Sequence, residues 1–510
     1  MQLEDFIQKS SYFSLGHLPT EGFHPATSNL SALTVSNPDE AIRLIGRVDA
    51  EAIQTLRDSL ESIQNLSAEI QVTLEHGNRV FISGCGATGR LALALESTFR
   101  SIHRGKPWEN RVQGLMAGGD FALVKSVENF EDFPSYGERH LSDLGFTEGD
   151  LLVAVTEGGE TPYVIGTVHG ALARSSRKPW FVFCNPSDLL AATVERSREV
   201  LEHPGVNSLC LSVGPMALSG STRLQAATVQ MLAVGIALTR NFALLDHLLV
   251  ELSRLDLASF LTPFVEWESG VYRSGGSVLY RTSTYPIAVL TDTTERSPTF
   301  SLAPFEKSTW SGEACSWCYL SIPDARSPLE SWERILNRKP IGLEWEEFSG
   351  KLGLQSILEF DFGRDAAEAR SQRIRPKKQE SIRIEKQAGT SRLELNTGTL
   401  ESALESSLLM DPLGSQILVK IILNTLSLVV MGRMGRYEGN VMTWVRSSNG
   451  KLIDRTLRYL DRLITKRGLP HPGREALIVM VFETQAAIGS DEAVILRVLE
   501  RIRSEAQSRP

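Results

Sequence analysis

The sequence has few cysteines and no surplus of positive charge. Five of its 510 residues are cysteine, and so small and odd a set fits a reducing compartment, the cytoplasm, better than a disulfide framework. Lysine and arginine together number 53 against 61 acidic residues, which gives a formal net charge of -8. Because no basic surplus is available to neutralise phosphates, neither a nucleic acid nor a membrane is expected as a partner.

Leader sequences, long hydrophobic runs and metal-binding motifs are also lacking. No charged and then apolar stretch opens the chain, and its most apolar segments, 231–238 and 421–431, are too short or too interrupted to span a bilayer. Cys315 and Cys318 have the spacing of a zinc or redox pair, but no second pair stands nearby, so we interpret them as structural cysteines. The sequence predicts a soluble protein with no metal and no cofactor.

What is present is an alternation of short apolar runs with helical stretches. A chain of this length exceeds what one hydrophobic core usually serves. Apolar runs in the first half are typical of buried parallel strands, and they cover 80–82, 151–155, 180–183 and 209–213. A less regular set in the second half covers 278–280, 287–290, 318–322 and 357–360. The pattern predicts an α/β fold with two doubly wound parallel sheets.

Helical segments are expected on both sides of this α/β region. Apolar residues three or four apart between 42 and 63 predict a long amphipathic helix, and helical periodicity returns after Pro412. The charged stretch 363–386 is expected to be a solvated helix or loop. The predicted domains are an N-terminal helical segment (1–75), a first α/β domain with two phosphate loops (76–245), a second, degenerate α/β domain (246–430) and a C-terminal, lid-like helical subdomain (431–510).

Two glycine-rich loops each stand between a predicted strand and a helix. The first reads SGCGATGR from Ser83 to Arg90, and the second reads TEGGETP from Thr156 to Pro162. Glycine lets the backbone approach an anion closely, and the start of a helix offers unpaired N–H groups. The spacing is not GxGxxG, and no acidic ribose partner is evident, so a dinucleotide site is disfavoured. Because the carboxyl ends of parallel strands meet at one sheet edge, both loops are predicted to hold one phosphate.

The loop pair resembles the sugar isomerase (SIS) domain, whose second loop usually reads Ser-x-Ser-Gly-Glu-Thr. Gly158 stands where that loop has a serine hydroxyl. More closely, the chain resembles the family of N-acetylmuramic acid 6-phosphate etherases and their animal relative, glucokinase regulatory protein. The matching stretches run in family order, and they are 18–21, 117–120, 128–132, 161–164, 184–186 and 218–223.

The resemblance implies two SIS domains in tandem that have lost different residues. Etherase subunits carry one SIS domain, whereas the regulatory protein carries two. The first half has Thr98 where the family has a glutamate, and the second half keeps that glutamate as Glu295. Conversely, no glycine loop is visible at 281–286, while a family lysine is kept as Lys420 and is replaced in the first half by Met231. One composite site that draws on both halves is therefore expected.

The resemblance also implies which residues form that site. Phosphate is expected on the hydroxyls of Thr88, Thr156 and Thr161 and on the amides of 157–160. The full set of expected ligand-binding residues is Gly86, Thr88, Glu131, Thr156, Glu157, Gly158, Gly159, Thr161, Arg223 and Lys420. If the chain is a lyase, Glu295 and Asp120 would be its catalytic carboxyl groups, with Asp120 standing in place of a family glutamate.

Three functions follow from the resemblance. The tandem arrangement, Asp120 and Gly158 favour a sugar-phosphate-binding protein that resembles the regulatory protein, with a phosphosugar as ligand and a sugar kinase or another protein as partner. The first alternative is an etherase-type carbon–oxygen lyase that converts N-acetylmuramic acid 6-phosphate to lactate and N-acetylglucosamine 6-phosphate, which requires one base and one acid. The second alternative, an amino-sugar phosphate isomerase, explains the loops but not the family match at 292–300.

Overall fold

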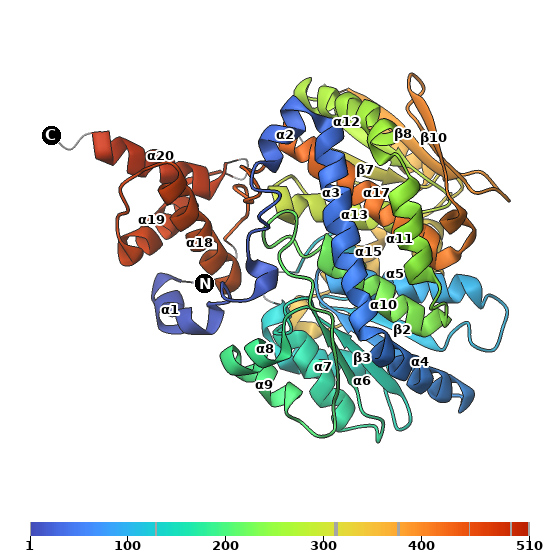
Figure 1. The fold of residues 1–510 in the computed structure, drawn as a ribbon. Helices are drawn as coiled ribbons and strands as arrows, with labels where there is room; N and C mark the ends of the chain where they lie inside the picture. Colours follow the sequence, from blue (N-terminus) through green and yellow to red (C-terminus); the bar gives the residue numbers. More distant parts are fainter. Residues whose placement is uncertain are drawn as a thin grey trace.

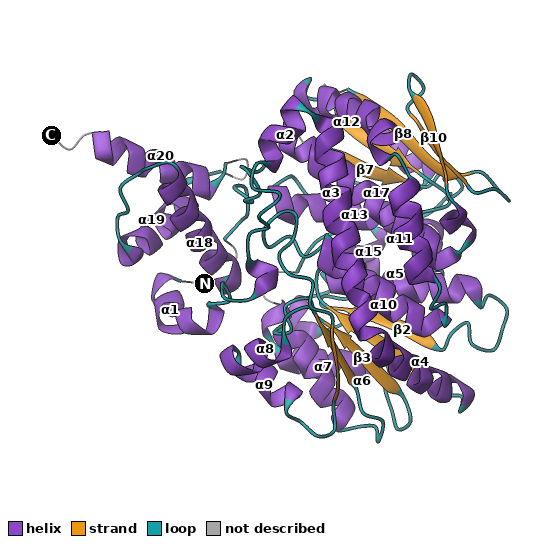
Figure 2. Cartoon of the chain, in the orientation of Figure 1, coloured by secondary structure: helices purple, strands orange, loops and turns teal. Residues whose placement is uncertain are grey.

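Two β-sheets form on either side of a layer of helices. The computed structural model describes residues 2–127, 130–310, 315–374, 378–447, 449–489 and 492–507. Figure 2 shows the strands of the described residues in two groups with helices between them. In Figure 1 the last helices of the chain and α1 (Leu3–Lys9) form a lobe beside this body. Of the predicted family match at 128–132, Glu128 and Asn129 lie outside the described residues.

The first sheet is parallel throughout, with the strand order β2-β1-β3-β4-β5. Its strands are β1 (Val80–Gly84), β2 (Val112–Met116), β3 (Leu151–Val155), β4 (Trp180–Phe183) and β5 (Asn207–Cys210). The connecting helices are α5 (Ala87–Ile102), α6 (Pro134–Asp143), α7 (Pro162–Leu172), α8 (Ser187–Thr193) and α9 (Glu195–Leu201). Every residue of β1 and β3 is buried, as in a sheet covered by helices on both faces. The predicted α/β class is confirmed.

The second sheet is mixed rather than wholly parallel. Its strand order is β10-β9-β8-β6-β7, in which β7, β6 and β8 run parallel whereas β8, β9 and β10 are antiparallel. The strands are β6 (Ser277–Arg281), β7 (Cys318–Ser321), β8 (Gln379–Lys386), β9 (Arg392–Asn396) and β10 (Glu401–Glu405). In β8 and β9 charged and apolar residues alternate. This pattern is typical of an antiparallel sheet, in which one face can be exposed to solvent. The charged stretch 363–386, predicted to be a helix or loop, contains a helix over Arg364–Arg373, but its second part is the strand β8, so the prediction is wrong there.

Two strands predicted in the second half are helices. The run 287–290 lies inside α13 (Pro286–Phe300), and 357–360 overlaps the end of α15 (Leu354–Leu358). A short apolar run has the same composition in a buried strand and in a buried helix, so periodicity does not separate the two. The helix predicted over 42–63 is divided into α3 (Pro38–Gln54) and α4 (Leu60–Glu75) by a 3-10 turn.

The helical layer joins the two halves of the chain. It contains α5 and α10 (Gln225–Thr239) from the first half and α13 and α17 (Pro412–Arg433) from the second, and α17 contacts the other three. By length and composition α17 could cross a membrane, but 89% of its apolar window is buried inside the protein, so it serves as a core helix. The other helices between the N-terminal lobe helix and α17 are α2 (Leu30–Ser36), α11 (Leu244–Arg254), α12 (Leu257–Arg273), α14 (Pro328–Leu336) and α16 (Arg364–Arg373).

The C-terminal lobe contacts the first half through ion pairs. It consists of α18 (Gly450–Lys466), α19 (Arg474–Ala487) and α20 (Val494–Gln507). Arg455 and Arg458 of α18 both pair with the buried Glu21, and Lys451 pairs with Glu160 of the second glycine loop. These contacts hold α18 over the edge of the first sheet. The domain boundaries at 75, 245 and 430 stay a prediction.

Candidate functional site

A cavity of about 400 Å³ opens between the two halves and α18. From the first half it is lined by the first glycine loop, by Glu131 and by the segment 220–223. From the second half Thr294 and Glu295 of α13 line it, and the C-terminal segment adds Asn449 and Arg455. The structure thus brings four of the predicted site residues, Gly86, Glu131, Arg223 and Glu295, to one cavity.

The first glycine loop is folded tightly at the end of β1. Gly86 has a φ of +55°, which favours glycine, and a Cβ on Gly84 would lie 2.3 Å from the carbonyl carbon of Thr88. The Thr88 hydroxyl donates to the carbonyl oxygen of Cys85 and accepts from its amide, each at 2.9 Å. Among the described residues that line the cavity Thr88 does not appear, so its side chain shapes the loop from within.

The second glycine loop lies behind the cavity and is held by its own contacts. The hydroxyls of Thr156 and Thr161 are 3.0 Å apart, and Asn185 and Ser197 donate to the carbonyl oxygens of Gly158 and Gly159. Gly159 has a φ of +78°. In the described part of the chain, none of the predicted residues 156–159 lines this cavity, and Thr161 lines a small neighbouring pocket instead.

Glu157 is a buried carboxyl group within that second loop. It is 8% exposed, and its Oε1 has no hydrogen-bond partner among the described residues. Burial raises the pKa of Glu157 to about 7, with Lys451 opposing the shift and the negative charge of Glu295 adding to it. Near neutral pH this carboxyl is therefore divided between its charged and uncharged forms.

Glu295 reaches the cavity from α13 and lies among cations. Its Oε1 is 3.6 Å from Nε of Arg90, a first-half residue on α5 that also lines the cavity. Burial raises the pKa of Glu295, and the positive charges of Arg90, Arg223 and Lys420 oppose that rise. The second half therefore supplies a carboxyl group to a cavity whose glycine loop belongs to the first half.

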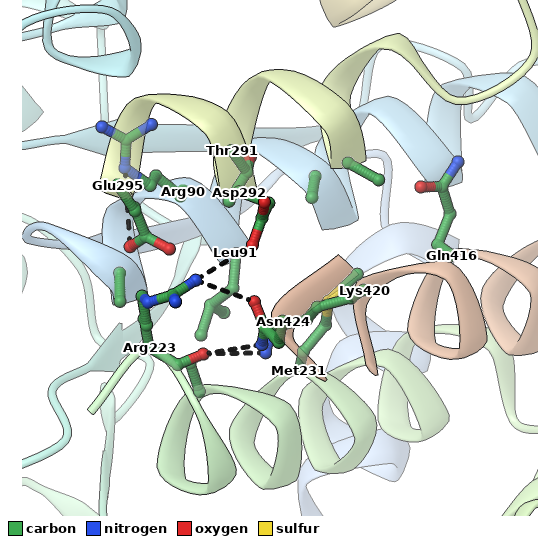
Figure 3. A pocket seen from close by; sticks show the side chains of 14 residues that line it. Arg90, Leu91, Arg223, Met231, Thr291, Asp292, Glu295, Gln416, Lys420 and Asn424 are labelled. Carbon is green, nitrogen blue, oxygen red and sulfur yellow. Dashed lines mark hydrogen bonds and ion pairs between the residues drawn. The ribbon is translucent and has the colours of Figure 1, made fainter. Parts of the chain in front are cut away.

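Arg223 is bound almost entirely by second-half residues. Its Nη1 donates to Asp292 at 3.0 Å and to Asn424 at 3.2 Å, and its Nη2 donates to Ser427 at 3.1 Å. Figure 3 shows Arg223 pointing from the start of α10 towards Asp292 and Asn424. A cation fixed in this way by partners from the opposite half can face an anionic ligand without moving.

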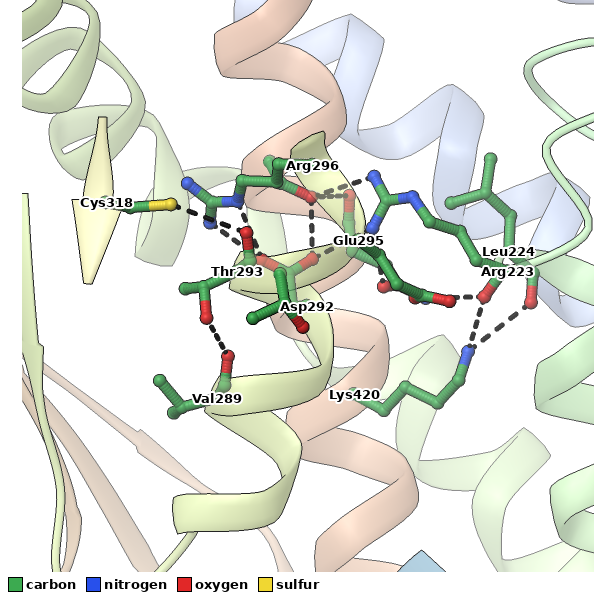
Figure 4. Close-up of polar contacts among 12 residues, drawn as sticks. Arg223, Leu224, Val289, Asp292, Thr293, Glu295, Arg296, Cys318 and Lys420 are labelled. Atoms are coloured by element: carbon green, nitrogen blue, oxygen red, sulfur yellow. Dashed lines mark hydrogen bonds and ion pairs between the residues drawn. The ribbon is translucent and has the colours of Figure 1, made fainter. Parts of the chain in front are cut away.

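Lys420 joins the two halves but does not reach the large cavity in the described structure. Its ammonium group donates to the carbonyl oxygens of Arg223 at 2.9 Å and Leu224 at 3.4 Å and to the hydroxyl of Thr228 at 2.7 Å, as Figure 4 shows in part. These three bonds use all three of its donors. Burial lowers the pKa of Lys420 to about 8. Lys420 extends from α17 to the start of α10, where its ammonium group holds the backbone of Arg223.

Asp120 is occupied by a second-half arginine. It accepts from Nη1 of Arg338 at 2.6 Å, from Nη2 at 3.1 Å and from the amide of Ile341 at 2.7 Å. Within the described residues Asp120 does not line the cavity. Glu131 does line it, and accepts from Sγ of Cys85 at 3.1 Å and from Asn449 at 3.0 Å.

Sequence reasoning missed several residues of this arrangement. Arg90 is the last residue of the motif SGCGATGR, so its position next to the first glycine loop could have identified it as a site residue. Asn449, Arg455 and Arg338 stand in no recognisable motif, and their roles arise from how distant segments pack. Charge and polarity alone do not single them out in a chain with 53 basic residues.

Comparison with known proteins identifies relatives of the chain. Residues 61–172 match the glucokinase regulatory protein N-terminal SIS domain. The chain is 33% identical to N-acetylmuramic acid 6-phosphate etherase of Picosynechococcus sp. over 232 residues. This alignment covers 45% of this chain and 71% of that protein. The corresponding etherase of Thermosynechococcus vestitus is 33% identical over 226 residues, covering 44% of this chain and 68% of that protein.

Among solved structures, the C-terminal domain of glucosamine-fructose-6-phosphate aminotransferase from Francisella tularensis overlays with a TM-score of 0.37 at 12% identity, covering 73% of this chain and 95% of that one. The sequence matches are the stronger finding, since they cover more than two thirds of the etherases. The chain belongs to the SIS-domain family of N-acetylmuramic acid 6-phosphate etherases and glucokinase regulatory protein.

Proposed function

We propose that this chain is a sugar-phosphate-binding protein with one composite phosphosugar site. The observation that carries the proposal is the cavity lined by Gly86 and Arg223 from the first half and by Glu295 from the second. The phosphate would bind at the start of α5, where backbone N–H groups and the helix dipole favour an anion. Thr88, Thr156, Thr161 and the loop 157–160 would shape this cradle from behind, and Glu131 and Arg223 would face the sugar.

The charges around the cavity support an anionic ligand. Arg90, Arg223 and Arg455 line it, and the carboxylate of Glu131 is already engaged by Cys85 and Asn449. Arg90 and Arg223 are buried, so their attraction to a phosphate is screened less than it would be in water. Lys420, in this proposal, acts on the ligand through the backbone of Arg223.

The test is ligand-induced thermal stabilisation of the full chain. N-acetylglucosamine 6-phosphate should raise the melting temperature, because a ligand at 100 times its Kd adds about 2.7 kcal/mol of stability. N-acetylglucosamine without the phosphate is the matched control and should give a much smaller shift. Equal shifts with and without phosphate, or no shift with any phosphosugar, would overturn the proposal.

A lyase of the etherase type is the second candidate. Two observations favour it, the 33% identity to etherases and the buried carboxyl of Glu295 beside Arg90. Against it stands Asp120, because a carboxylate bound by Arg338 and a backbone amide is poorly placed to exchange a proton with a substrate. Lactate release from N-acetylmuramic acid 6-phosphate, with Glu295→Gln as control for contaminating etherase, separates the two candidates. Release that Glu295→Gln abolishes would make the chain a lyase.

A protein partner belongs to the same proposal. Binding at a cavity lined by both halves and by α18 would favour one packing of the C-terminal lobe, since a ligand shifts a conformational equilibrium by its differential affinity. The likeness to glucokinase regulatory protein makes a sugar kinase the first partner to test. Binding of the kinase should then differ between phosphosugar-bound and free protein.

A further inference from the structure

A second, smaller cavity lies directly behind Glu295. It measures about 20 Å³ and shares Ala87, Arg90, Arg223 and Glu295 with the larger cavity. Figure 3 shows the side chains that surround it, contributed by α5 and α10 from the first half and by α13 and α17 from the second. This smaller cavity, the inner cavity, thus adjoins the proposed ligand site at the residues that line both.

The two sides of the inner cavity differ in chemistry. Apart from the two arginines, the first half contributes apolar side chains, which are Ala87, Leu91, Ala94, Ala227 and Met231. The second half contributes mostly polar ones, which are Thr291, Asp292, Glu295, Gln416, Lys420 and Asn424. A guest in this cavity would therefore bind through one side and pack against the other.

Three polar atoms of these lining residues lack a partner. They are Nε of Arg223, Oγ1 of Thr291 and Oε1 of Gln416, and each is buried with no hydrogen-bond partner in the described part of the chain. A buried donor or acceptor without a partner is destabilising, so native proteins nearly always satisfy such groups. Because three residues that carry such an atom all line one small cavity, we infer a guest there that bonds to some of these atoms.

The charges on the wall identify the kind of guest. Arg90 pairs with Glu295 and Arg223 pairs with Asp292, and the ammonium group of Lys420 already has three neutral acceptors. The charged groups of the wall are therefore engaged with one another or with the protein, and neither an added cation nor an added anion is favoured. The unpartnered atoms include a donor, Nε of Arg223, and an acceptor, Oε1 of Gln416, and a hydroxyl group can serve both kinds. A volume of about 10–15 Å³ is enough for one water, and the inner cavity exceeds it.

We propose that the inner cavity is a binding site for one hydroxyl oxygen, supplied by water or by a hydroxyl of the ligand. Bonded to the polar side of the cavity, this oxygen fixes the side chains of Arg223 and Glu295 where they meet the larger cavity. The water form needs no ligand, whereas the sugar-hydroxyl form rests on the proposed function. The apolar side formed by Leu91, Ala94 and Met231 keeps further water out.

A crystal structure of the full chain without sugar tests the water form. We expect density for an ordered water within hydrogen-bond distance of at least one of Arg223, Thr291 and Gln416. A dry cavity would overturn the water form and leave only the sugar-hydroxyl form to be tested. This result is independent of whether any phosphosugar binds, so it distinguishes failure of the inner cavity from failure of the proposed function.

A second crystal structure with bound N-acetylglucosamine 6-phosphate identifies the source of the oxygen. Water that stays in place shows a solvent site behind the ligand, and a sugar hydroxyl in its position shows an extension of the ligand site. Either outcome supports the hydroxyl site, and an inner cavity without an oxygen in both structures contradicts it.

Two variants test whether the oxygen acts on ligand binding. Thr291→Val keeps the shape of the side chain but removes its hydroxyl, and should weaken binding of N-acetylglucosamine 6-phosphate by about tenfold. Thr291→Ser keeps the hydroxyl and should bind nearly as the parent does. Equal affinity of Thr291→Val and Thr291→Ser, at matched thermal stability, would refute a role for the inner cavity in binding.

Discussion

At the scale of single residues, Glu157 and Glu295 are two buried glutamates that are held in different ways. Glu295 lies 3.6 Å from Arg90 and is surrounded by positive charge, whereas Glu157 has an oxygen without a partner among the described residues. Burial raises the pKa of both, and that of Glu157 reaches about 7. An opposite charge stabilises the ionised form of a carboxyl group, and burial destabilises it. The positive charges around Glu295 therefore oppose the rise in its pKa, whereas burial is the main influence on Glu157.

Glu157 should make the stability of the protein depend on pH. Its folded-state pKa of about 7 lies above that of an unfolded glutamate, so the unfolded chain loses the proton first as pH rises. This group therefore stabilises the fold fully only below the unfolded pKa, and that contribution, about 3 kcal/mol, is lost between about pH 4.5 and 7. Glu157→Gln should reduce this loss, as measured by urea unfolding at several pH values.

The comparison of parent and variant isolates Glu157 from other buried acids. Asp49 and Asp132 also have pKa values raised to about 6, mainly by burial, and both remain in the variant. If the two proteins lose the same stability between pH 5 and 7, Glu157 is already ionised in the folded state over that range, and burial does not raise its pKa to about 7.

At the scale of elements, the segment that follows α14 clamps the second half onto the first. Arg338 bonds both Asp120 and Glu96, and Asn337 donates to Ser97. Further along, Trp345 stacks on Phe130 with ring centroids 5.5 Å apart. Because Glu131 follows Phe130 directly, this segment supports a residue of the cavity from behind.

Removing the Arg338 side chain should be costly. Arg338→Met leaves the buried carboxylates of Glu96 and Asp120 without this partner, and breaking a buried ion pair typically costs about 3–5 kcal/mol. Arg334→Met is the matched control, since Arg334 pairs with Glu330 at the surface, where a pair contributes about 0–1 kcal/mol. Chemical unfolding of both variants measures the difference. Similar losses in the two would show that the clamp is not a stabilising feature.

The sequence predicted the elements of the first half better than those of the second. Apolar runs have a clear meaning in a parallel sheet, and 151–155 and 180–183 gave the bounds of β3 and β4. The run 80–82 fell short of the end of β1, the run 209–213 was displaced from β5, and β2 was missed. In the second half the run 287–290 was wrongly predicted as a strand, because α13 is buried around much of its circumference and shows no polar face there. The antiparallel β9 and β10 were missed, since their charged residues at solvent-facing positions hide the apolar alternation.

The candidate site was predicted in part for a similar reason. Gly86, Arg223 and Glu295 line the cavity, and each belongs to a motif that can be recognised from the sequence alone. The distances that engage Asp120 with Arg338 and Lys420 with the backbone of Arg223 depend on long-range packing. A motif carries no information about long-range packing. It therefore does not tell which of its residues line the cavity and which lie behind it.

At the scale of the whole molecule, the two halves pack into one unit. Arg223 of the first half is bound by Asp292 and Asn424 of the second, and Lys420 of the second half is bound by the first. These contacts are buried, so neither half would keep its side of the larger cavity alone. The central claim is therefore that a phosphosugar bound at the first-half glycine loop also interacts with Glu295 of the second half.

Titration calorimetry with Glu295→Gln tests that claim most directly. The parent should bind N-acetylglucosamine 6-phosphate, Glu295→Gln should bind it about tenfold or more weakly, and Glu401→Gln, an exposed second-half glutamate on β10, should bind it as the parent does. Parent-like affinity of Glu295→Gln would contradict the composite site and confine binding to the first half.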